Sequence, residues 1–305
     1  MEVIMTDILK SRHSASSTMH RSNINEVAVA HRMTDIYEAA VTYRVTPGEA
    51  VQVFVLAGER VGGDPLALSE GVISKAVIDI VGQPMLSRVL RSLGASRANL
   101  PAHVIGLMGD ALERATDGIA CHFIEAQGKG PAASLLKALE EGGVALPLLV
   151  TTGDHALLTP EMIDTFLEKS AASDADVTIG LAERVIIEAA YPQTRRTYLP
   201  LGGVELSGCD MYYLATPKAL SVVRFWQRAE RDRKKPWRLA WHFGPLTALR
   251  ILLARSGPEA VFGMLSRRLG VRVRPIIMAF AEAAIDVDKT DDLALVREII
   301  ANRAK

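Results

Sequence analysis

The chain has 305 residues, of which 49% are hydrophobic, enough to bury the core of one large domain or two small ones. Its formal net charge is zero, which argues against a protein that binds polyanions over its whole surface. Its two cysteines lie far apart, and no apolar stretch reaches the length of a transmembrane helix. Because the first 30 residues also lack the apolar core of a signal peptide, we expect a cytoplasmic protein.

Residues 1–48 show no regular pattern, and we expect a weakly structured N-terminal extension without chemistry of its own. We treat residues 49–305 as one domain. Its pattern begins at residues 51–57, a β-rich apolar run that stops at Gly58, as in a buried strand followed by a loop.

Strand and helix patterns then alternate along the chain. The predicted strands are 103–107, 119–124, 147–151 and 175–181, and the predicted helices are 84–93, 132–140 and one that begins at Thr159. Thr159, Pro160 and Glu161 suit the N-cap, the first position and the first turn of that helix. Strands alternating with helices predict an α/β fold with a parallel sheet.

The pattern changes after residue 200. Short strands are expected at 204–206 and 211–215, and residues 217–270 are predicted to be a mostly helical insertion. A strand at 271–280, an acidic turn at 286–292 and a final helix to about residue 301 complete the chain.

Ligands of open parallel sheets bind beyond the carboxyl ends of the strands, so the residues after each strand are the candidates for chemistry. After the first strand comes a turn of small residues with Arg60, and Lys75 follows. Backbone N–H groups of such a turn can approach phosphate oxygens, and the two cations would add positive charge. The alternative is an ordinary turn with surface charges.

Two acidic segments follow later strands. Asp154 lies just past the apolar run 147–151, where a carboxylate would face a nucleotide, although capping of a turn is an alternative role for it. Asp286 and Asp288 alternate on an expected strand end and would point the same way. Because Mg²⁺ prefers oxygen ligands, Asp154 with Asp286 or Asp288 predicts a metal site.

Three ordered motifs resemble those of the MobA-like NTP transferase family. They are Leu56-Ala57-Gly58-Glu59-Arg60, then Lys75 with Gly82-Gln83-Pro84-Met85-Leu86, then Gly153-Asp154 with a late acidic segment from Asp286 to Leu293. The resemblance covers about residues 51–303. It implies a nucleotidyltransferase with a Rossmann-like three-layer sandwich and a mostly parallel sheet.

The resemblance also implies roles for single residues. Arg60 and Lys75 would be catalytic cations on the phosphates, and Asp154, Asp286 and Asp288 would hold Mg²⁺. The nucleotide would contact Leu56, Ala57, Gly58, Gly128, Lys129, Gly130 and Ser134, and the acceptor would contact Ser207, Gly208 and Asp210. One departure is Glu59, which stands where the family usually has a second glycine, so its carboxylate is expected to point away from the triphosphate or to help hold metal.

One section of the chain is strongly basic. Residues 224–274 hold thirteen Arg and Lys against three Asp and Glu, with Trp226, Trp237 and Trp241 among them. Three interpretations stay open: a solvated helical face with buried Trp, contact with a membrane surface or lipid precursor, and binding of the acceptor's phosphate. No nucleic-acid reading module is visible, so we expect no nucleic-acid partner.

We therefore expect an enzyme that moves a nucleoside monophosphate from an NTP to a small phosphorylated acceptor. The alternatives are a non-catalytic nucleotide-binding regulator and a membrane-surface protein acting through residues 224–274. The sequence leaves the base and the acceptor open.

Overall fold

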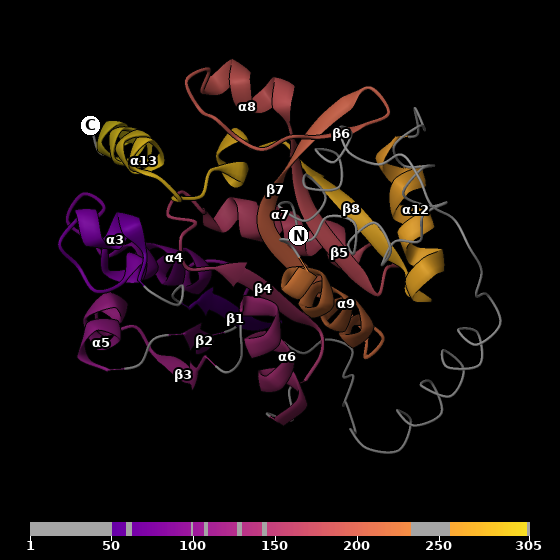
Figure 1. Ribbon diagram of the computed structural model, residues 1–305, viewed down its shortest axis with the longest axis horizontal. Helices are drawn as coiled ribbons and strands as arrows, with labels where there is room; N and C mark the ends of the chain where they lie inside the picture. The colour runs from indigo at the N-terminus through magenta and orange to yellow at the C-terminus, as the bar shows by residue number, and fades with distance from the viewer. Residues whose placement is uncertain are drawn as a thin grey trace.

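A computed structural model describes residues 51–58, 63–98, 100–106, 109–126, 130–141, 145–232 and 257–303. These residues form one sheet of eight strands with helices packed on both faces (Figure 1). The expected α/β sandwich with a mostly parallel sheet is confirmed. The expectation for residues 1–48 concerns a part of the chain outside the described residues.

The sheet has the order β3-β2-β1-β4-β7-β5-β8, with β6 paired to β7. Its strands are β1 (Gln52–Ala57), β2 (Ala102–Gly106), β3 (Cys121–Glu125), β4 (Leu148–Thr152), β5 (Val177–Glu183), β6 (Leu199–Leu201), β7 (Val204–Leu214) and β8 (Val273–Met278). β7 runs antiparallel to its neighbours, whereas β1 to β4 are parallel to one another and β5 is parallel to β8. The chain runs outward from β1 to β3 and returns on the other side of β1 as β4. The strand order therefore reverses between β1 and β4, the point where open α/β sheets bind ligands.

Two layers of helices cover the sheet. One face packs against α6 (Pro131–Glu141), α9 (Ala219–Asp232) and α12 (Pro258–Leu269), and the other against α4 (Met85–Gly94), α5 (Asp110–Thr116), α7 (Pro160–Ala171) and α8 (Arg184–Ala190). α3 (Pro65–Ser69) and α13 (Thr290–Arg303) add a smaller cluster near α4, and 3₁₀ turns η2 (Lys75–Val77) and η3 (Ala281–Ala284) connect elements. None of the described helices is long and apolar enough to cross a membrane.

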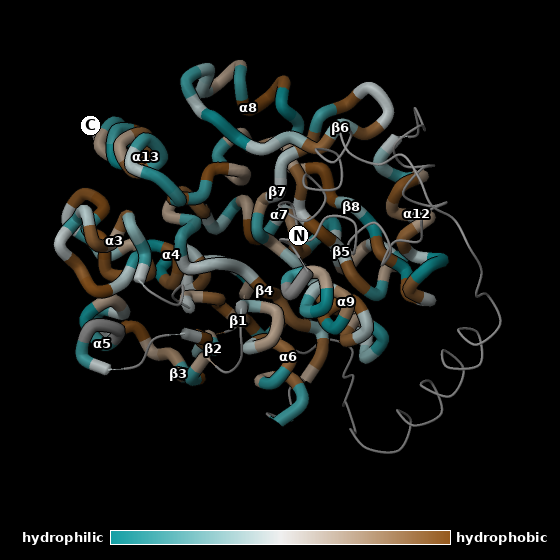
Figure 2. Tube along the Cα trace, in the orientation of Figure 1, coloured by the Kyte–Doolittle hydropathy of each residue, from teal (hydrophilic) through white to brown (hydrophobic). Residues whose placement is uncertain are grey.

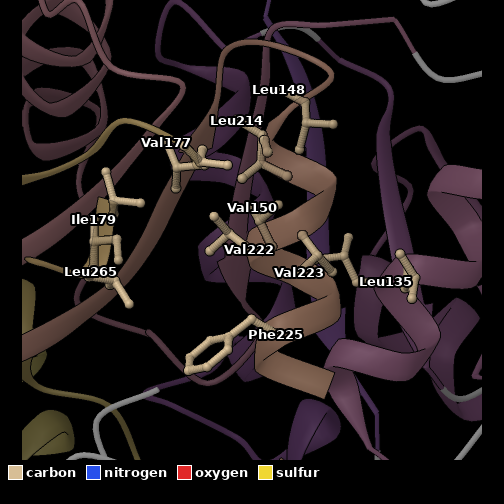
Figure 3. Packing of buried hydrophobic residues seen from close by; sticks show 14 of the residues in the cluster. Leu135, Leu148, Val150, Val177, Ile179, Leu214, Val222, Val223, Phe225 and Leu265 are labelled. Carbon is tan, nitrogen blue, oxygen red and sulfur yellow. The ribbon is translucent and has the colours of Figure 1, made fainter. Parts of the chain in front are cut away.

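Alternation of side chains along the strands divides the core in two. In β1, Phe54 and Leu56 belong to the cluster under α6, α9 and α12, whereas Val53 and Val55 belong to the opposite one. Figure 3 shows Val222 and Phe225 of α9 in the first cluster, and Figure 2 shows hydrophobic residues running through β1 and β2. Burying each such side chain stabilises the fold by about 1.5–3 kcal/mol.

β7 differs from the sequence prediction because it is one long strand rather than two short ones. Residues 207–210, which lie between the two expected strands, stay in β7, and the strand bulges at residues 209–211. Gly180 of β5 alone stands opposite three residues of β7, Cys209, Asp210 and Met211, and Asp210 takes a left-handed φ of 47°. An added Cβ at Gly180 would lie 3.3 Å from the Cβ of Cys209, so this glycine makes room for the bulge.

The helical insertion is confirmed only at its two ends. α9 and α12 lie within the predicted range 217–270, and residues 233–256 lie outside the described part of the chain. The sequence analysis did not predict α8 or β6, both of which are short. The helix predicted from Thr159 is α7, and the Thr159 side chain accepts a hydrogen bond from Met162 N as its N-cap.

Candidate active site

Glycines bring the ends of β1, β2 and β4 into close backbone contact. Gly153 N–H donates to Leu56 O at 2.9 Å, and a Cβ added to Gly153 would lie 3.1 Å from the Cβ of Ala57. A Cβ added to Gly106 would lie 2.5–2.7 Å from backbone atoms of Ala57 and Gly58. Since the Leu56 side chain is buried in the core, Leu56 offers this edge of the sheet only its backbone.

Three of the predicted acidic residues converge at this edge. Asp154, Asp286 and Asp288 each offer a carboxylate oxygen, and these atoms all lie within 4.8 Å of one another. The strand expected to hold Asp286 and Asp288 is absent there, because β8 ends at Met278 and residues 285–288 form an irregular turn. The two carboxylates nevertheless meet Asp154, since Val287 N–H donates to the carbonyl oxygen of Asp154 at 3.1 Å.

Lys75 lies among these carboxylates. Its Nζ is 2.7 Å from Asp154 Oδ2 and 2.9 Å from Asp288 Oδ1, and the side chain is 17% exposed. Burial alone would lower the pKa of the ammonium, but the charges of Asp154 and Asp288 outweigh it and hold the pKa above its ordinary value. Lys75 is therefore a permanent positive charge beside the acidic triad.

A second buried cation, Arg196, was missed by the sequence analysis. It lies between α8 and β6 with its side chain only 8% exposed. Its guanidinium forms an ion pair with Asp286, donates to the Asp286 carbonyl at 3.0 Å, and lies 2.5 Å from Asp292 Oδ1. Nothing in the surrounding sequence marks this arginine, because its partners are 90 and 96 residues away.

The bulge in β7 brings Asp210 toward the same place. Burial raises the pKa of Asp286 well above its usual range, and the charges of Asp210 and Asp154 raise it further against the opposing effect of Arg196. Five carboxylates thus share the region with two cations, Lys75 and Arg196, among the described residues. With every group ionised the negative charges exceed the positive ones by three, so a nucleoside triphosphate would be repelled unless further positive charge is bound.

Unsatisfied polar atoms are concentrated at the end of β4 and in the turn that follows it. Buried oxygens of Thr151, Thr152 and Asp154 and the Nδ1 of His155 have no hydrogen-bond partner among the described residues. Buried polar atoms are normally paired, so this group indicates a place where water or a ligand binds. Burial lowers the pKa of His155, and its Nε2 lies 3.3 Å from the carbonyl oxygen of Glu282, which requires the proton on that nitrogen. His155 is thus a neutral supporting residue.

The other predicted site residues have different positions. Ser134 Oγ donates to Gly130 O within α6, and the Glu230 carboxylate of α9 accepts from Ala132 N at 3.3 Å. In β7, Ser207 is buried and Gly208 stands opposite Leu181 of β5. Outside the described residues lie the predicted Arg60, Gly128 and Lys129, together with Glu59.

The basic section is partly neutralised where it is described. Arg224 pairs with Glu140 at 2.6 Å, and Arg272 and Arg274 pair with the exposed carboxylate of Asp174. Trp226 packs against the core, with its ring centroid 5.6 Å from that of Tyr212. These contacts agree with the first of the three interpretations, a solvated face with buried Trp, whereas Trp237 and Trp241 lie outside the described residues.

Comparison with protein families gives a match for residues 53–201, described as "MobA-like NTP transferase domain". This chain carries a MobA-like NTP transferase domain. The matched range contains β1, Lys75, Asp154 and Arg196, whereas Asp210, Asp286 and Asp288 follow it. The nucleotidyltransferase family inferred from the motifs is thereby confirmed.

Solved structures agree with this MobA-like domain. A hypothetical transferase structure from Thermus thermophilus is 29% identical with a TM-score of 0.68, covering 80% of this chain and all of the other. CMP:2-keto-3-deoxy-manno-octonic acid synthetase complexed with CTP is 15% identical with a TM-score of 0.54, and the match covers 84% of this chain and 100% of the other. A nucleotidyl transferase from Methanothermobacter thermautotrophicus is 13% identical with a TM-score of 0.50 and the same coverage. The last two share the fold. No curated protein matches the chain.

Proposed function

We propose that this MobA-like domain transfers a nucleoside monophosphate from an NTP to a small phosphorylated acceptor, with Mg²⁺ as cofactor. The observation that carries the proposal is the meeting of Lys75, Asp154 and Asp288 beyond the β1–β4 switch point. A cation and a set of carboxylates at that position are the groups that phosphoryl-transfer chemistry requires.

The residues present fit a divalent cation. Asp154, Asp286 and Asp288 would hold it through oxygen atoms, the ligands that Mg²⁺ prefers, and the unpaired buried Oδ1 of Asp154 supports this assignment. Bound Mg²⁺ would neutralise phosphate charge and polarise the phosphoryl group. It would also reduce the negative balance that repels a triphosphate.

The chain's own groups then have distinct tasks. Lys75 would release its carboxylates and bind phosphate oxygens, while the Gly58 turn, with Arg60, would surround the triphosphate. An acceptor phosphate oxygen attacks the α-phosphorus, a new P–O bond forms, and the bond to pyrophosphate breaks. Because a phosphate acceptor is already ionised, the reaction needs no general base, and the buried His155 is assigned only a supporting role.

The acceptor would bind on the β7 side of the carboxylates. Asp210 is held there in a left-handed conformation that non-glycine residues seldom adopt, and such backbone outliers concentrate at functional sites. Gly208 and Ser207 belong to the same strand. Asp210 would accept hydrogen bonds from the part of the acceptor that does not react.

The test is calorimetric binding of CTP, GTP, ATP and UTP, with and without Mg²⁺, to the parent protein, Asp154→Ala and a control, Asp174→Ala. The control removes an exposed carboxylate, 64% accessible, whose partners are Arg272 and Arg274. We expect Mg²⁺-dependent binding of one NTP, loss of it in Asp154→Ala and no change in the control. Equal binding to all three proteins, or no binding to the parent, would overturn the proposal.

A further inference from the structure

Arg196 reaches the acidic centre from outside the sheet. It lies in the connection between α8 and β6, while the groups that it binds, Asp286 and Asp292, belong to the turn before α13 and to its first turn. Few connecting segments bury an arginine, because its charge must be compensated by well-placed partners. Here the planar guanidinium contacts two carboxylates and one carbonyl oxygen at once.

Asp292 continues this contact to the main chain. Its Oδ1 faces Arg196, and its Oδ2 accepts hydrogen bonds from Asp288 N at 3.2 Å and Lys289 N at 3.0 Å. Arg196 therefore fixes the side chain of Asp286 directly and the backbone of Asp288 through Asp292. The two ion pairs of Arg196 thus help to hold both metal-binding candidates that follow β8.

We propose that Arg196 and Asp292 are positioning residues that present Asp286 and Asp288 to the divalent cation. The inference rests on the proposed function of the same site. Simple charge counting predicts that removing a positive charge beside a cation site strengthens metal binding. A positioning role requires weaker binding, because loss of a residue that orients metal ligands costs about 10–100-fold in affinity.

The chain offers a matched control for this arginine. Arg184 lies on α8, the helix before the same connection, and it also binds two carboxylates, those of Glu188 and Glu205. Its side chain is 43% exposed, and both partners lie outside the acidic triad. Arg184→Gln thus removes an equal charge and an equal number of ion pairs without touching the turn at 286–292.

The experiment measures Mg²⁺ binding by calorimetry and Mn²⁺ binding by paramagnetic resonance, without nucleotide, for the parent, Arg196→Gln, Arg196→Lys, Asp292→Asn and Arg184→Gln. We expect about tenfold weaker binding or worse in Arg196→Gln and Asp292→Asn. The metal affinity of Arg196→Lys should lie between that of these two variants and that of the parent, because lysine keeps the charge but lacks the planar guanidinium that contacts two carboxylates. The metal affinity of Arg184→Gln should equal that of the parent.

Activity at rising Mg²⁺ gives a second readout. The rate lost in Arg196→Gln should return at high Mg²⁺, with the KM for the NTP at saturating metal unchanged. Should Arg196→Gln not fold, Asp292→Asn carries the same prediction. Unchanged or tighter metal binding in folded variants overturns the positioning role and leaves the proposed function standing, whereas a parent protein that binds no metal overturns both.

Discussion

The main-chain N–H of Val287 donates to the carbonyl oxygen of Asp154 at 3.1 Å. This hydrogen bond joins the turn after β4 to the segment that holds Asp286 and Asp288, so the backbone helps to set the spacing of the three carboxylates. Side chains in the triad can therefore be changed one at a time with little movement of the others.

Replacing Lys75 by methionine should separate metal binding from catalysis. Because Lys75 Nζ occupies oxygens of Asp154 and Asp288, its removal should tighten Mg²⁺ binding without nucleotide by about tenfold. Turnover should fall by about 10²–10³-fold, since a cation on the phosphates is lost. Calorimetry and initial rates measure both. Lys169→Met is the control, because Lys169 lies on α7 and donates to the carbonyl oxygen of Ile277 on β8. Weaker metal binding in Lys75→Met would contradict the assignment.

Stabilisation of the fold by Mg²⁺ should increase with pH. Burial and the charges of Asp210 and Asp154 raise the pKa of Asp286 in the folded protein. At pH values between the unfolded and the folded pKa, the folded state binds an extra proton. The free energy of unfolding therefore falls as the pH rises through this range. A metal binds only the ionised carboxylate and should relieve this destabilisation. The shift in melting temperature caused by Mg²⁺ should thus be larger at pH 8 than at pH 5. Equal shifts at the two pH values would argue that the metal binds elsewhere.

Two glycine-to-alanine substitutions should have opposite effects on stability. In Gly106→Ala the new Cβ would lie 2.5 Å from the carbonyl carbon of Ala57, so the backbone must shift at a cost of about 1–3 kcal/mol. In Gly263→Ala the new Cβ meets only Arg267, at 3.8 Å, inside α12, and the helix should gain about 0.5–1 kcal/mol. Urea unfolding measures both. Similar effects of the two substitutions would disprove the close approach of β1 and β2.

The substitution Asp210→Asn should weaken binding of the acceptor and leave binding of the NTP unchanged. Asparagine tolerates the left-handed φ of 47°, so the bulge is expected to survive while the charge is lost. The KM for the acceptor should rise about tenfold, the loss expected for one charged hydrogen bond, with the KM for the NTP unchanged. Steady-state kinetics with each substrate varied in turn provide the measurement. A change confined to the NTP would assign Asp210 to the nucleotide or the metal.

Local sequence patterns were sufficient to predict the parallel half of the fold. β1 and β4 are apolar runs that end at glycines, and α7 begins with a threonine cap and a proline, so neighbouring residues determine these elements. Asp154 and Lys75 were predicted for the same reason, because each follows a recognisable motif.

Features that depend on distant residues were not predicted correctly. The bulge at Asp210 requires the space left by Gly180 on another strand, and the pattern of β7 alone therefore suggested two strands and a turn. Arg196 has no local signal, since its place is determined by Asp286 and Asp292 far along the chain. Asp286 and Asp288 were predicted to point the same way from a strand end; their carboxylates do lie close together, but residues 285–288 form an irregular segment and not a strand.

The ion pair between Lys75 and Asp288 connects residues 213 positions apart, which has a consequence for biosynthesis. A nascent chain that has emerged from the ribosome through Met278 contains every strand of the sheet, yet it lacks Asp286, Asp288 and Asp292. Arg297 of α13 then binds Glu70 at 2.6 Å and fastens the late segment onto the earliest part of the domain. If the carboxylates bind metal as proposed, a nascent chain can acquire metal affinity only after Asp292 in the first turn of α13 has been translated, later than every strand of the sheet.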